Sequence, residues 1–520
     1  LVEPNIYSVV EGMSFSIDKE CEIYNYSLSI GCCIRCSLRL SGVRSPSHYE
    51  NPVHSPVTLG YTNSSVSEVK NNYPCIACLG ILDDETLTAI AAEVNNQEYD
   101  CDVFTCALTI PIAVQLRERS LQINLSRKFE FSKEAAAGFK RTVPQIKEVW
   151  KWIVLPEVEK LIDKTGVPIS ATCPFVIDVF LAYSQDEDEC KALITILISP
   201  IVDRLKMCGN TFKKRLQQKK KYSDGVFSRK SVETAMINTL ENQFVEHYPC
   251  PPSHPSSQTF INEVTCAHSS FFVGGRYNKY SRELSQTPWF ICGQKKMETS
   301  VQELLCDPIV KFVKADSMKF LSSGREDVDV RTLHSGRPFA VELLNPRITK
   351  LSEAILQDLT QKINTSTELV HIVGNLQSIS RDKLKTLKEG EDTKTKTYRA
   401  LCLCRSQPLP TLDVLNEIRD LEVIQKTPVR VLHRRPLATR LRTIHAMKAS
   451  WIKVEDELLE KSNDLATNLF ILDLTTQAGT YVKEFVHGDF GRTKPSICEI
   501  LQIEVDIVAL DVTSINLNWP

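Results

Sequence analysis

Hydrophobic positions along the chain follow two different periods. One apolar set recurs at helical spacing and predicts a helix that ends near Pro156; its members are Ile146, Val149, Trp150 and Ile153. A β-rich apolar run over 175–183 follows Pro174 and predicts a strand. No fixed-period repeat was found, so a solenoid is excluded in favour of mixed helices and strands.

The length of the chain requires more than one domain. Its 520 residues exceed the roughly 250–300 that one hydrophobic core accommodates. The Pro- and Ser-rich stretch 248–257 is the strongest internal boundary signal, because it cannot continue a helix or a central strand. We expect a loop-rich module over 1–80, an accessory domain over 81–265 and a second unit of strands and helices over 266–520.

Two cysteine pairs have the spacing of metal-binding knuckles. Cys33 and Cys36 form one Cys-x-x-Cys pair, and Cys75 and Cys78 form the other. Together they predict a structural zinc site with four sulfur ligands, which leaves no open position for catalysis. About 38 residues separate the pairs, a long insertion that the slow growth of loop-closure entropy tolerates. The alternative is two unrelated buried or redox pairs.

Charge and hydropathy bound the location and the partners. The formal net charge of −2 gives no global nucleic-acid signature, so RNA binding would need a local cluster of cations. The longest apolar run, 192–202, is too short for a bilayer, and most of the 18 cysteines are scattered. We expect a soluble intracellular protein without a membrane partner; nucleus, cytoplasm and mitochondrion stay open.

The segment 426–448 supplies such a local cluster. It holds seven Lys or Arg and no acidic residue, with His433 and His445 in addition. A strip of this charge can neutralise several phosphates. The alternative is an ordinary basic surface loop.

The densest chemical signal is the stretch Ser322–Arg331. Its glycine and its run of charged residues predict a loop between two strands, where catalytic groups are common. Arg325 and Arg331 can keep a neighbouring carboxylate ionised and oriented. From these residues alone, an ion-paired turn and a carboxylate active site are both open.

A family resemblance changes this balance. Gly324-Arg-Glu-Asp327 resembles the Gly-Arg-x-Asp catalytic loop of TruA-type pseudouridine synthases. Five longer sequence motifs are more specific, and they resemble the tenth of the eukaryotic and archaeal Pus families, closely over 271–520. These motifs are Gly275-Arg-Tyr-Asn-Lys-Tyr-Ser-Arg282, Gln286-Thr-Pro-Trp289, Lys396-Thr-Tyr398, Arg430-Val-Leu-His-Arg-Arg-Pro436 and the segment 478–495. The resemblance implies an α+β catalytic domain with a mixed or antiparallel sheet, and an N-terminal THUMP-containing α/β domain with a zinc module.

The same resemblance implies the roles of individual residues. Asp327 is at the position of the catalytic carboxylate, with Asp329 as its rival. Arg325 helps to hold the target nucleotide out of its helix. Tyr398 stacks on the base and Lys483 pairs with the catalytic carboxylate, while an apolar residue near 500–501 completes the pocket.

RNA contacts are expected from two groups of residues, by phosphate pairing and by stacking on unpaired bases. The first is Arg276, Tyr277, Lys279, Tyr280 and Arg282; the second is Arg430, His433, Arg434, Arg435, Arg440 and Arg442.

The resemblance further implies isomerisation of uridine to pseudouridine in tRNA, at position 54 or 55 of the TΨC arm, with structural zinc and no organic cofactor. Other structured RNA remains a possible partner, and the oligomeric state is open. The alternatives are a non-catalytic RNA-binding or RNA-processing factor, and a THUMP-bearing methyltransferase or thiolase that needs a cofactor or ATP.

Overall fold

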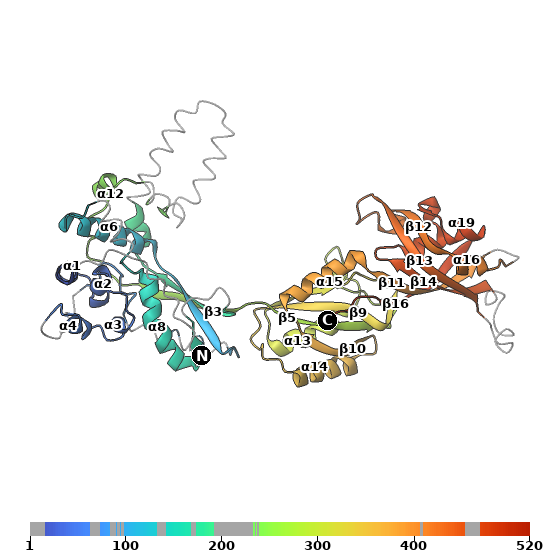
Figure 1. The fold of residues 1–520 in the computed structure, drawn as a ribbon, viewed down its shortest axis with the longest axis horizontal. Coiled ribbons are helices and arrows are strands. Elements are labelled where there is room, and N and C mark those ends of the chain that lie inside the picture. The colour runs from blue at the N-terminus through green and yellow to red at the C-terminus, as the bar shows by residue number, and fades with distance from the viewer. Residues whose placement is uncertain are drawn as a thin grey trace, which may run out of the picture. The chain divides into compact units, whose positions relative to one another are not determined.

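The chain divides into two compact units. The computed structural model describes residues 16–62, 73–83, 90, 94, 98–132, 142–167, 173–191, 232–233, 236, 239–405, 409–452 and 468–520. Unit 1 comprises Leu1–Ala267 and unit 2 comprises His268–Pro520. Their elements are labelled in Figure 1.

Unit 1 combines short helices with a small sheet of order β2-β1-β3-β4, in which β1 is parallel to β2 and to β3. Its strands are β1 (Val103–Thr109), β2 (Thr165–Gly166), β3 (Phe175–Ala182) and β4 (Phe260–His268). Its helices include α1 (Ile17–Ser29), α2 (Ile34–Leu40), α3 (Ser47–Glu50), α4 (Ser55–Thr58), α6 (Ile112–Lys128), α8 (Ile146–Ile162) and α12 (Glu241–His247).

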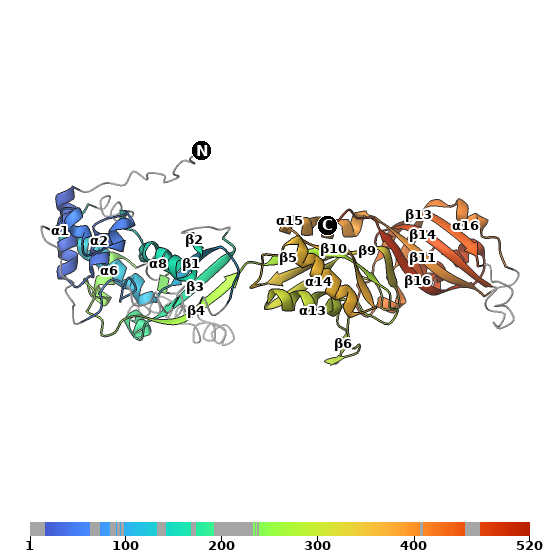
Figure 2. The ribbon, with the colours of Figure 1, turned by 90° about the horizontal axis from the view of Figure 1, so that it is seen from below.

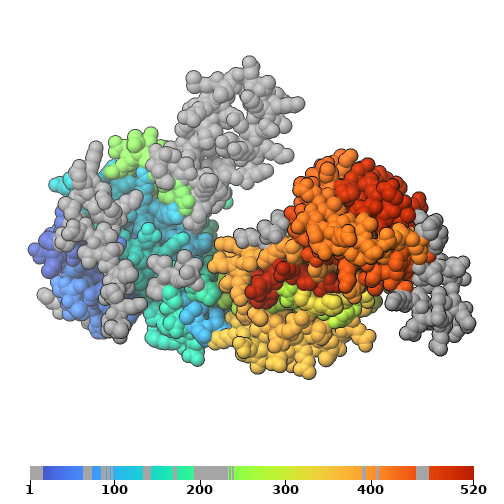
Figure 3. Space-filling view, turned by 45° about the vertical axis from the view of Figure 1, so that its right-hand side comes forward, coloured from blue at the N-terminus to red at the C-terminus, as the bar shows by residue number. Residues whose placement is uncertain are grey.

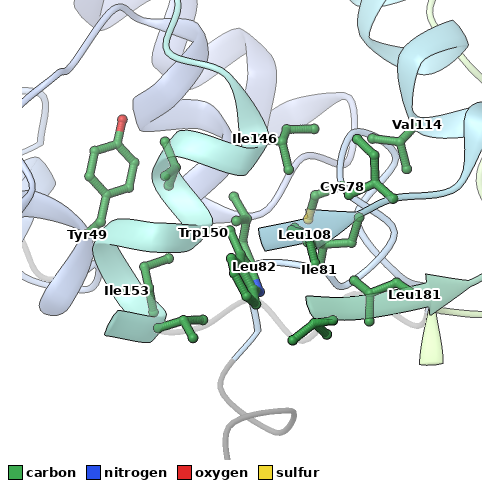
Figure 4. Close-up of a cluster of buried hydrophobic side chains, with 14 of the residues drawn as sticks. Tyr49, Cys78, Ile81, Leu82, Leu108, Val114, Ile146, Trp150, Ile153 and Leu181 are labelled. Carbon is green, nitrogen blue, oxygen red and sulfur yellow. The ribbon is translucent and has the colours of Figure 1, made fainter. Parts of the chain in front are cut away.

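One hydrophobic core joins the cysteine-rich N-terminal segment to this sheet. Figure 4 shows Tyr49, Cys78 and Leu82 around Trp150 of α8, with Leu108 and Leu181 from the strands. The four residues at helical spacing are all buried in α8, as their periodicity predicts. The helix continues past Pro156 to Ile162, however, so the proline does not end it.

The boundary between the units follows Ala267 and not the Pro- and Ser-rich stretch. The residues after that stretch form β4, which completes the sheet of unit 1 beside β3. The Pro- and Ser-rich stretch therefore forms a loop inside unit 1, because the strand that follows it pairs with the sheet of the same unit.

Unit 2 is built on one long sheet of order β10-β5-β9-β16-β11-β14-β13-β12-β15, with β8 pairing to β9 (Figure 2). In this sheet β16 pairs with β9 in parallel, and every other pair of neighbouring strands is antiparallel. The strands are β5 (Phe271–Lys279), β8 (Ser317–Ser322), β9 (Arg331–Leu344), β10 (Val370–Ser378), β11 (Thr395–Cys404), β12 (Arg419–Lys426), β13 (Thr439–Trp451), β14 (Leu469–Gln477), β15 (Thr493–Lys494) and β16 (Val505–Ile515); β6 (Phe290–Ile291) and β7 (Gln294–Lys295) form a separate hairpin.

Alternating residues place helices on both faces of this sheet. Phe339 and Val341 of β9 pack with α13 (Val301–Val313) and α14 (Glu353–Ser366), whereas Ala340 between them packs on the opposite face. That second face forms one core with α15 (Arg381–Thr393), α16 (Asp413–Glu417), α18 (Val482–His487) and α19 (Ile497–Leu501). Figure 1 shows α15 on one side of β5 and β9, with α13 and α14 on the other. The period-two pattern therefore produces a three-layer arrangement.

The C-terminal residues are bound into unit 2. The guanidinium of Arg276 donates to the carbonyl oxygens of Ile515, Leu517 and Trp519, and also to those of Ser335 and Gly336. In Figure 3 the dark red C-terminal segment lies against orange and yellow segments of the same unit.

The α+β class predicted from the sequence is confirmed, and the second unit has the expected mixed sheet. In the part of the chain that the structure describes, no helix is both long and apolar enough to cross a bilayer.

Gly274 of β5 is required by the ring of Trp519. A Cβ at Gly274 would lie 2.7 Å from that ring and 3.0 Å from Ile379. We predict that Gly274→Ala lowers the free energy of unfolding by about 1–3 kcal/mol, the cost of overpacking a core, in urea titrations. In a Trp519→Leu background the same substitution should cost less; an equal cost in both backgrounds would contradict the explanation.

Candidate active site

The loop between β8 and β9 carries the predicted catalytic carboxylate on a turn supported by a buried ion pair. Glu326 contacts Arg337 at 2.6 Å, and their side chains are 0% and 2% exposed. Glu326 also accepts hydrogen bonds from the hydroxyl of Tyr277 and the amide of Gln286. Because buried charges must be paired, this contact fixes the residue directly before Asp327.

Gly324 opens the same turn in a conformation that favours glycine. Its φ is +80°, and a Cβ there would lie 2.9 Å from Nζ of Lys396 and 3.2 Å from Nη1 of Arg337. Both the backbone angle and the close cations therefore select glycine at this position.

Lys279 holds the backbone of the loop from beneath. Its buried ammonium group donates to the carbonyl oxygens of Leu284, Asp327 and Val328 at 2.7, 3.2 and 2.6 Å. Burial lowers the pKa of Lys279 to about 8, although the nearby Glu326 carboxylate opposes that shift. The position of Asp327 is thus set by contacts that are hidden from solvent.

Asp327 faces a cavity of about 560 Å³. Tyr398, Lys483 and Arg325 line the same cavity, so the four residues predicted to be catalytic are brought together. They come from the β8–β9 loop, from β11 and from the start of α18. The cavity is strongly cationic, since its nine basic residues face the carboxylates of Glu326 and Asp327; they are Arg325, Arg337, Lys396, Arg430, Arg434, Arg435, Arg440, Arg442 and Lys483.

The shortest ion pair of Asp327 is with Arg430. Nη1 of Arg430 lies 2.6 Å from Oδ2 of Asp327, while its Nε lies 2.5 Å from the buried carboxylate of Glu484. Oδ1 of Asp327 has Arg434 at the longer distance of 3.8 Å. One carboxylate oxygen is therefore held and the other is only loosely engaged.

Lys483 pairs more closely with Asp329 than with Asp327, contrary to its expected role. Its Nζ lies 2.7 Å from Asp329 and 3.7 Å from Asp327. Burial acts to raise the pKa of Asp329, but the hydrogen bonds and charge of Lys483 outweigh it, and that pKa falls below its ordinary value. Asp327 and Asp329 are thereby both held near cations.

Tyr398 is a half-buried aromatic wall of the cavity. Burial raises the pKa of its hydroxyl, and the charge of Arg337 opposes the rise. Two buried guanidinium nitrogens of the lining, Nη1 of Arg440 and Nε of Arg442, have no hydrogen-bond partner among the described residues. Such donors suit an anion in the cavity.

Several residues predicted to contact RNA are structural. Tyr277 and Lys279 are 0% exposed, so their prediction as RNA contacts is wrong. The guanidinium of Arg276 is occupied by five backbone carbonyls. Arg282 donates to the carboxylate of Asp511 and to the carbonyl of Asp329, which braces the β8–β9 loop.

Other members of the predicted RNA-binding set remain accessible. Tyr280 is 44% exposed and His433 is exposed, and neither lines the cavity. Arg434, Arg435, Arg440 and Arg442 do line it. Arg430 was predicted to bind RNA, and its present partners are Asp327 and Glu484.

Sequence reasoning missed Glu484 and the apolar wall. Glu484 directly follows Lys483, and an acid next to the lysine of a mostly basic and apolar motif was the available signal. The expected apolar contribution near 500–501 is wrong, because Ile500 and Leu501 pack on the hydrophobic core. Leu510 and Val512 of β16 line the cavity instead.

In unit 1 the two cysteine pairs converge. The sulfur atoms of Cys33, Cys36, Cys75 and Cys78 lie within 4.8 Å of one another, and Cys33 and Cys78 are 3.9 Å apart. Tetrahedral zinc with bonds of ~2.3 Å separates sulfurs by roughly 3.8 Å. Hydrogen bonding to the thiol of Cys33, and then to Cys75 and Cys78, raises the pKa of Cys36 well above its usual value. A cation would relieve this crowding, so the group can hold a metal ion.

Unit 2 has the mixed sheet that the sequence predicted for a pseudouridine synthase. Its cavity brings a loop carboxylate beside an aromatic ring and a lysine, as expected for that class. Both units match models of one family. Residues 272–516 match "Pus10, C-terminal", and residues 75–266 match "Eukaryotic Pus10, N-terminal". The chain belongs to the Pus10 family.

Individual relatives agree with this assignment. The chain is 38% identical to "tRNA pseudouridine synthase Pus10" of Homo sapiens, covering 89% of this chain and 82% of that protein. Its identity to the protein of the same name in Xenopus laevis is 38%, over 95% and 96% of the two chains.

A solved Cbf5-Nop10-Gar1 complex includes a chain that is 16% identical, with a TM-score of 0.24 and coverage of 46% of this chain and 48% of that chain.

The buried amine of Lys279 should make stability depend on pH. Its pKa of about 8 in the folded state is below the ~10.4 of an unfolded lysine, so between these values the unfolded chain holds more protons. The unfolding free energy of the wild type, relative to Lys279→Met, should therefore rise by about 1–3 kcal/mol from pH 7 to pH 10. Urea unfolding at both pH values measures this difference, and no change would mean that the amine keeps an ordinary pKa.

Proposed function

We propose that this protein isomerises uridine to pseudouridine in tRNA, with position 54 or 55 of the TΨC arm as the target. The observation that carries the proposal is the position of Asp327 in a cationic cavity beside Tyr398 and Lys483. The relatives named tRNA pseudouridine synthase support the same activity.

In this proposal Asp327 acts on the sugar of the target nucleotide, as nucleophile or as base. Arg430 holds Oδ2, and Oδ1 is the oxygen with the looser contact. Glu484 in turn keeps Arg430 from turning away from the cavity. The carboxylate is thus presented in one orientation before the RNA arrives.

Tyr398 stacks on the uracil, and Arg325 holds the nucleotide out of its helix. An enzyme that acts on a base must extrude it, at a cost of a few kcal/mol. Arg325 is exposed at the rim of the turn and has no ion-pair partner among the described residues, so its charge is available to a phosphate. The flipped base then lies between an aromatic wall and the loop carboxylate.

The RNA backbone is gripped by the basic lining. Arg434 and Arg435 are exposed, while Arg440 and Arg442 offer buried nitrogens without partners in the described part of the chain. Phosphates satisfy such donors, and binding of this kind weakens steeply as salt increases. His433 and Tyr280 extend the contact surface, and other structured RNA with an accessible uridine is a secondary partner.

In unit 1 we propose a zinc-stabilised module over 1–80 and a THUMP-containing RNA-binding domain over 81–265. All four sulfurs lie within 4.8 Å of one another, and Cys33 and Cys78 are 3.9 Å apart, near the separation in a tetrahedral zinc site, which supports zinc as the ion. The zinc would neutralise the thiolates and cross-link α2 to the segment that contains Cys75. Thiolate ligands of this kind suit a reducing compartment, in the nucleus, cytoplasm or mitochondrion.

If Asp327 is catalytic, replacing its carboxylate by an amide should cause a large loss of activity. Asp327→Asn should reduce pseudouridine formation on an unmodified tRNA transcript by about 10³-fold or more, as for other essential catalytic groups. Site-mapped pseudouridine detection, without added cofactor, measures it. Asp329→Asn tests the rival carboxylate and should retain far more activity than Asp327→Asn, because Asp329 is mostly exposed and lies outside the set of residues that line the cavity.

The two variants also separate the alternatives. Asp327→Asn should still bind the transcript, and wild-type rates in that variant would refute the catalytic role. Binding without any isomerisation in the wild type would favour a non-catalytic RNA-binding factor. Activity that appears only with a methyl donor or ATP would favour a different class of tRNA enzyme.

Zinc predicts a separate effect on unit 1. Wild-type protein should contain about one zinc per chain by metal analysis, and the double variant Cys75→Ser, Cys78→Ser should contain none and unfold in unit 1. Cys292→Ser, at an exposed cysteine, is the control and should keep its metal. A folded wild type that is free of metal would contradict a structural zinc.

A further inference from the structure

One aromatic side chain of unit 2 is presented almost entirely to solvent. Phe490 is 95% exposed. Its backbone has φ +56° and ψ 37°, the left-handed region that a bulky residue rarely adopts. Asp489 directly before it also has a positive φ, of 48°. Neither the exposure nor the backbone angle contributes to folding stability.

The turn that holds Phe490 is fixed by many hydrogen bonds. Gly491 N and Thr493 N both donate to the carbonyl of Gly488. The carboxylate of Asp489, which is 5% exposed, accepts from Val429 N and lies 3.6 Å from Arg492. Arg492 donates to the carbonyl of Thr427, and Lys426 N donates to the carbonyl of Arg492. The ring is therefore exposed on a well-anchored turn.

These contacts connect the turn to the candidate active site. Val429, which binds Asp489, directly precedes Arg430, the ion-pair partner of Asp327. Gly488 N donates to the carbonyl of Glu484, whose carboxylate holds Arg430. Phe490 thus belongs to the same local framework as the catalytic carboxylate, although it lies outside the set of residues that line the cavity.

The surroundings of the turn match a nucleic acid. Val429 is 46% exposed and adds apolar surface. Lys426 is exposed, and the side chain of Lys494 is 64% exposed, with Glu499 at 3.6 Å. The exposed Arg434 and Arg435 follow on the same segment. An aromatic face among cations is the combination that stacks on an unpaired base while its phosphates are neutralised.

We propose that Phe490 is a stacking platform for an unpaired base of the RNA substrate, at a position other than the target uridine. The proposal rests on the proposed function only in its choice of RNA. The proposal accounts for the unfavourable backbone angle of Phe490, because strained backbone persists at sites that bind ligands. It also accounts for the exposure of the ring, because an aromatic ring loses its unfavourable hydration on stacking.

Affinity for an unmodified tRNA transcript tests the proposal in the full-length protein. Phe490→Ala should raise Kd by about 5- to 150-fold, the range for loss of one base–aromatic stack. Phe490→Trp should bind as well as the wild type, whereas Phe490→Leu, apolar but not aromatic, should bind nearly as weakly as the alanine variant. Val508→Ala, at an apolar residue that is 57% exposed on β16, is the control and should leave Kd unchanged.

Stability separates a binding role from a structural one. Phe490→Gly removes the ring and suits the positive φ, so its thermal midpoint should equal or exceed that of the wild type while its affinity falls. A lower midpoint would show that the ring supports the fold and would overturn the proposal. Affinity of Phe490→Leu equal to that of the wild type would overturn stacking as well, in favour of an apolar contact.

The proposed activity and this platform fail in different ways. If the wild type binds the transcript but makes no pseudouridine, the proposed function fails and the affinity series still tests Phe490. If the wild type is active and Phe490→Ala binds RNA normally, the platform is refuted alone. A photo-reactive phenylalanine analogue at position 490 should cross-link to a nucleotide of a loop, and a cross-link to protein only would refute the RNA contact.

Discussion

The buried ion pair between Glu326 and Arg337 is the contact on which the site depends. Both side chains are almost fully hidden, and removal of either partner would leave a charge that burial makes costly. Since Glu326 precedes Asp327 in the turn and Arg337 belongs to β9, the pair couples the direction of the carboxylate to the central sheet. Tyr277 and Gln286 donate to the carboxylate of Glu326, and Lys279 donates to the backbone carbonyls of the turn.

Charge in the cavity is arranged in two layers. The inner layer neutralises itself, through Glu326 with Arg337 and Glu484 with Arg430. The outer layer is an excess of arginines without matching acids in the lining. The small net charge of −2 for the whole chain hides this local excess, because most of the acids lie elsewhere. Electrostatic attraction of a polyanion is therefore expected at the candidate active site, despite the small net charge of the chain.

Much of the fold was predictable where one local pattern determines one element. The helix that contains Trp150 and the strand at 175–182 follow from periodicity alone. Asp327, Arg325, Tyr398 and Lys483 were predicted from motifs that resemble a family, and the metal site was predicted from the spacing of the two cysteine pairs. The members of each group do meet in space. The partners of each side chain were less accessible, because Arg430 is about a hundred residues from Asp327 in sequence, and the order of contacts depends on the packing of β12, α18 and the loop.

The motif around Lys279 shows why side-chain type alone misassigns roles. A basic and aromatic cluster suggests RNA, yet three of its members are internal supports: Tyr277 and Lys279 are fully buried, and the guanidinium of Arg276 is saturated by backbone oxygens. Conversely, an aromatic residue in a glycine-rich turn gives no strong sequence signal, and Phe490 is noticed only when its exposure and its backbone angle are known.

The order of strands in the sheet has a consequence for biosynthesis. Strand β16 is the last of the strands in sequence, yet it lies between β9 and β11 and joins the two halves of the sheet. During translation β9 and β11 are synthesised before β16, so each has one unpaired edge until β16 leaves the ribosome. The sheet of unit 2 therefore cannot be completed until nearly the whole unit has been made. Nascent chains would spend that interval with two open strand edges, a state for which chaperones have an obvious use.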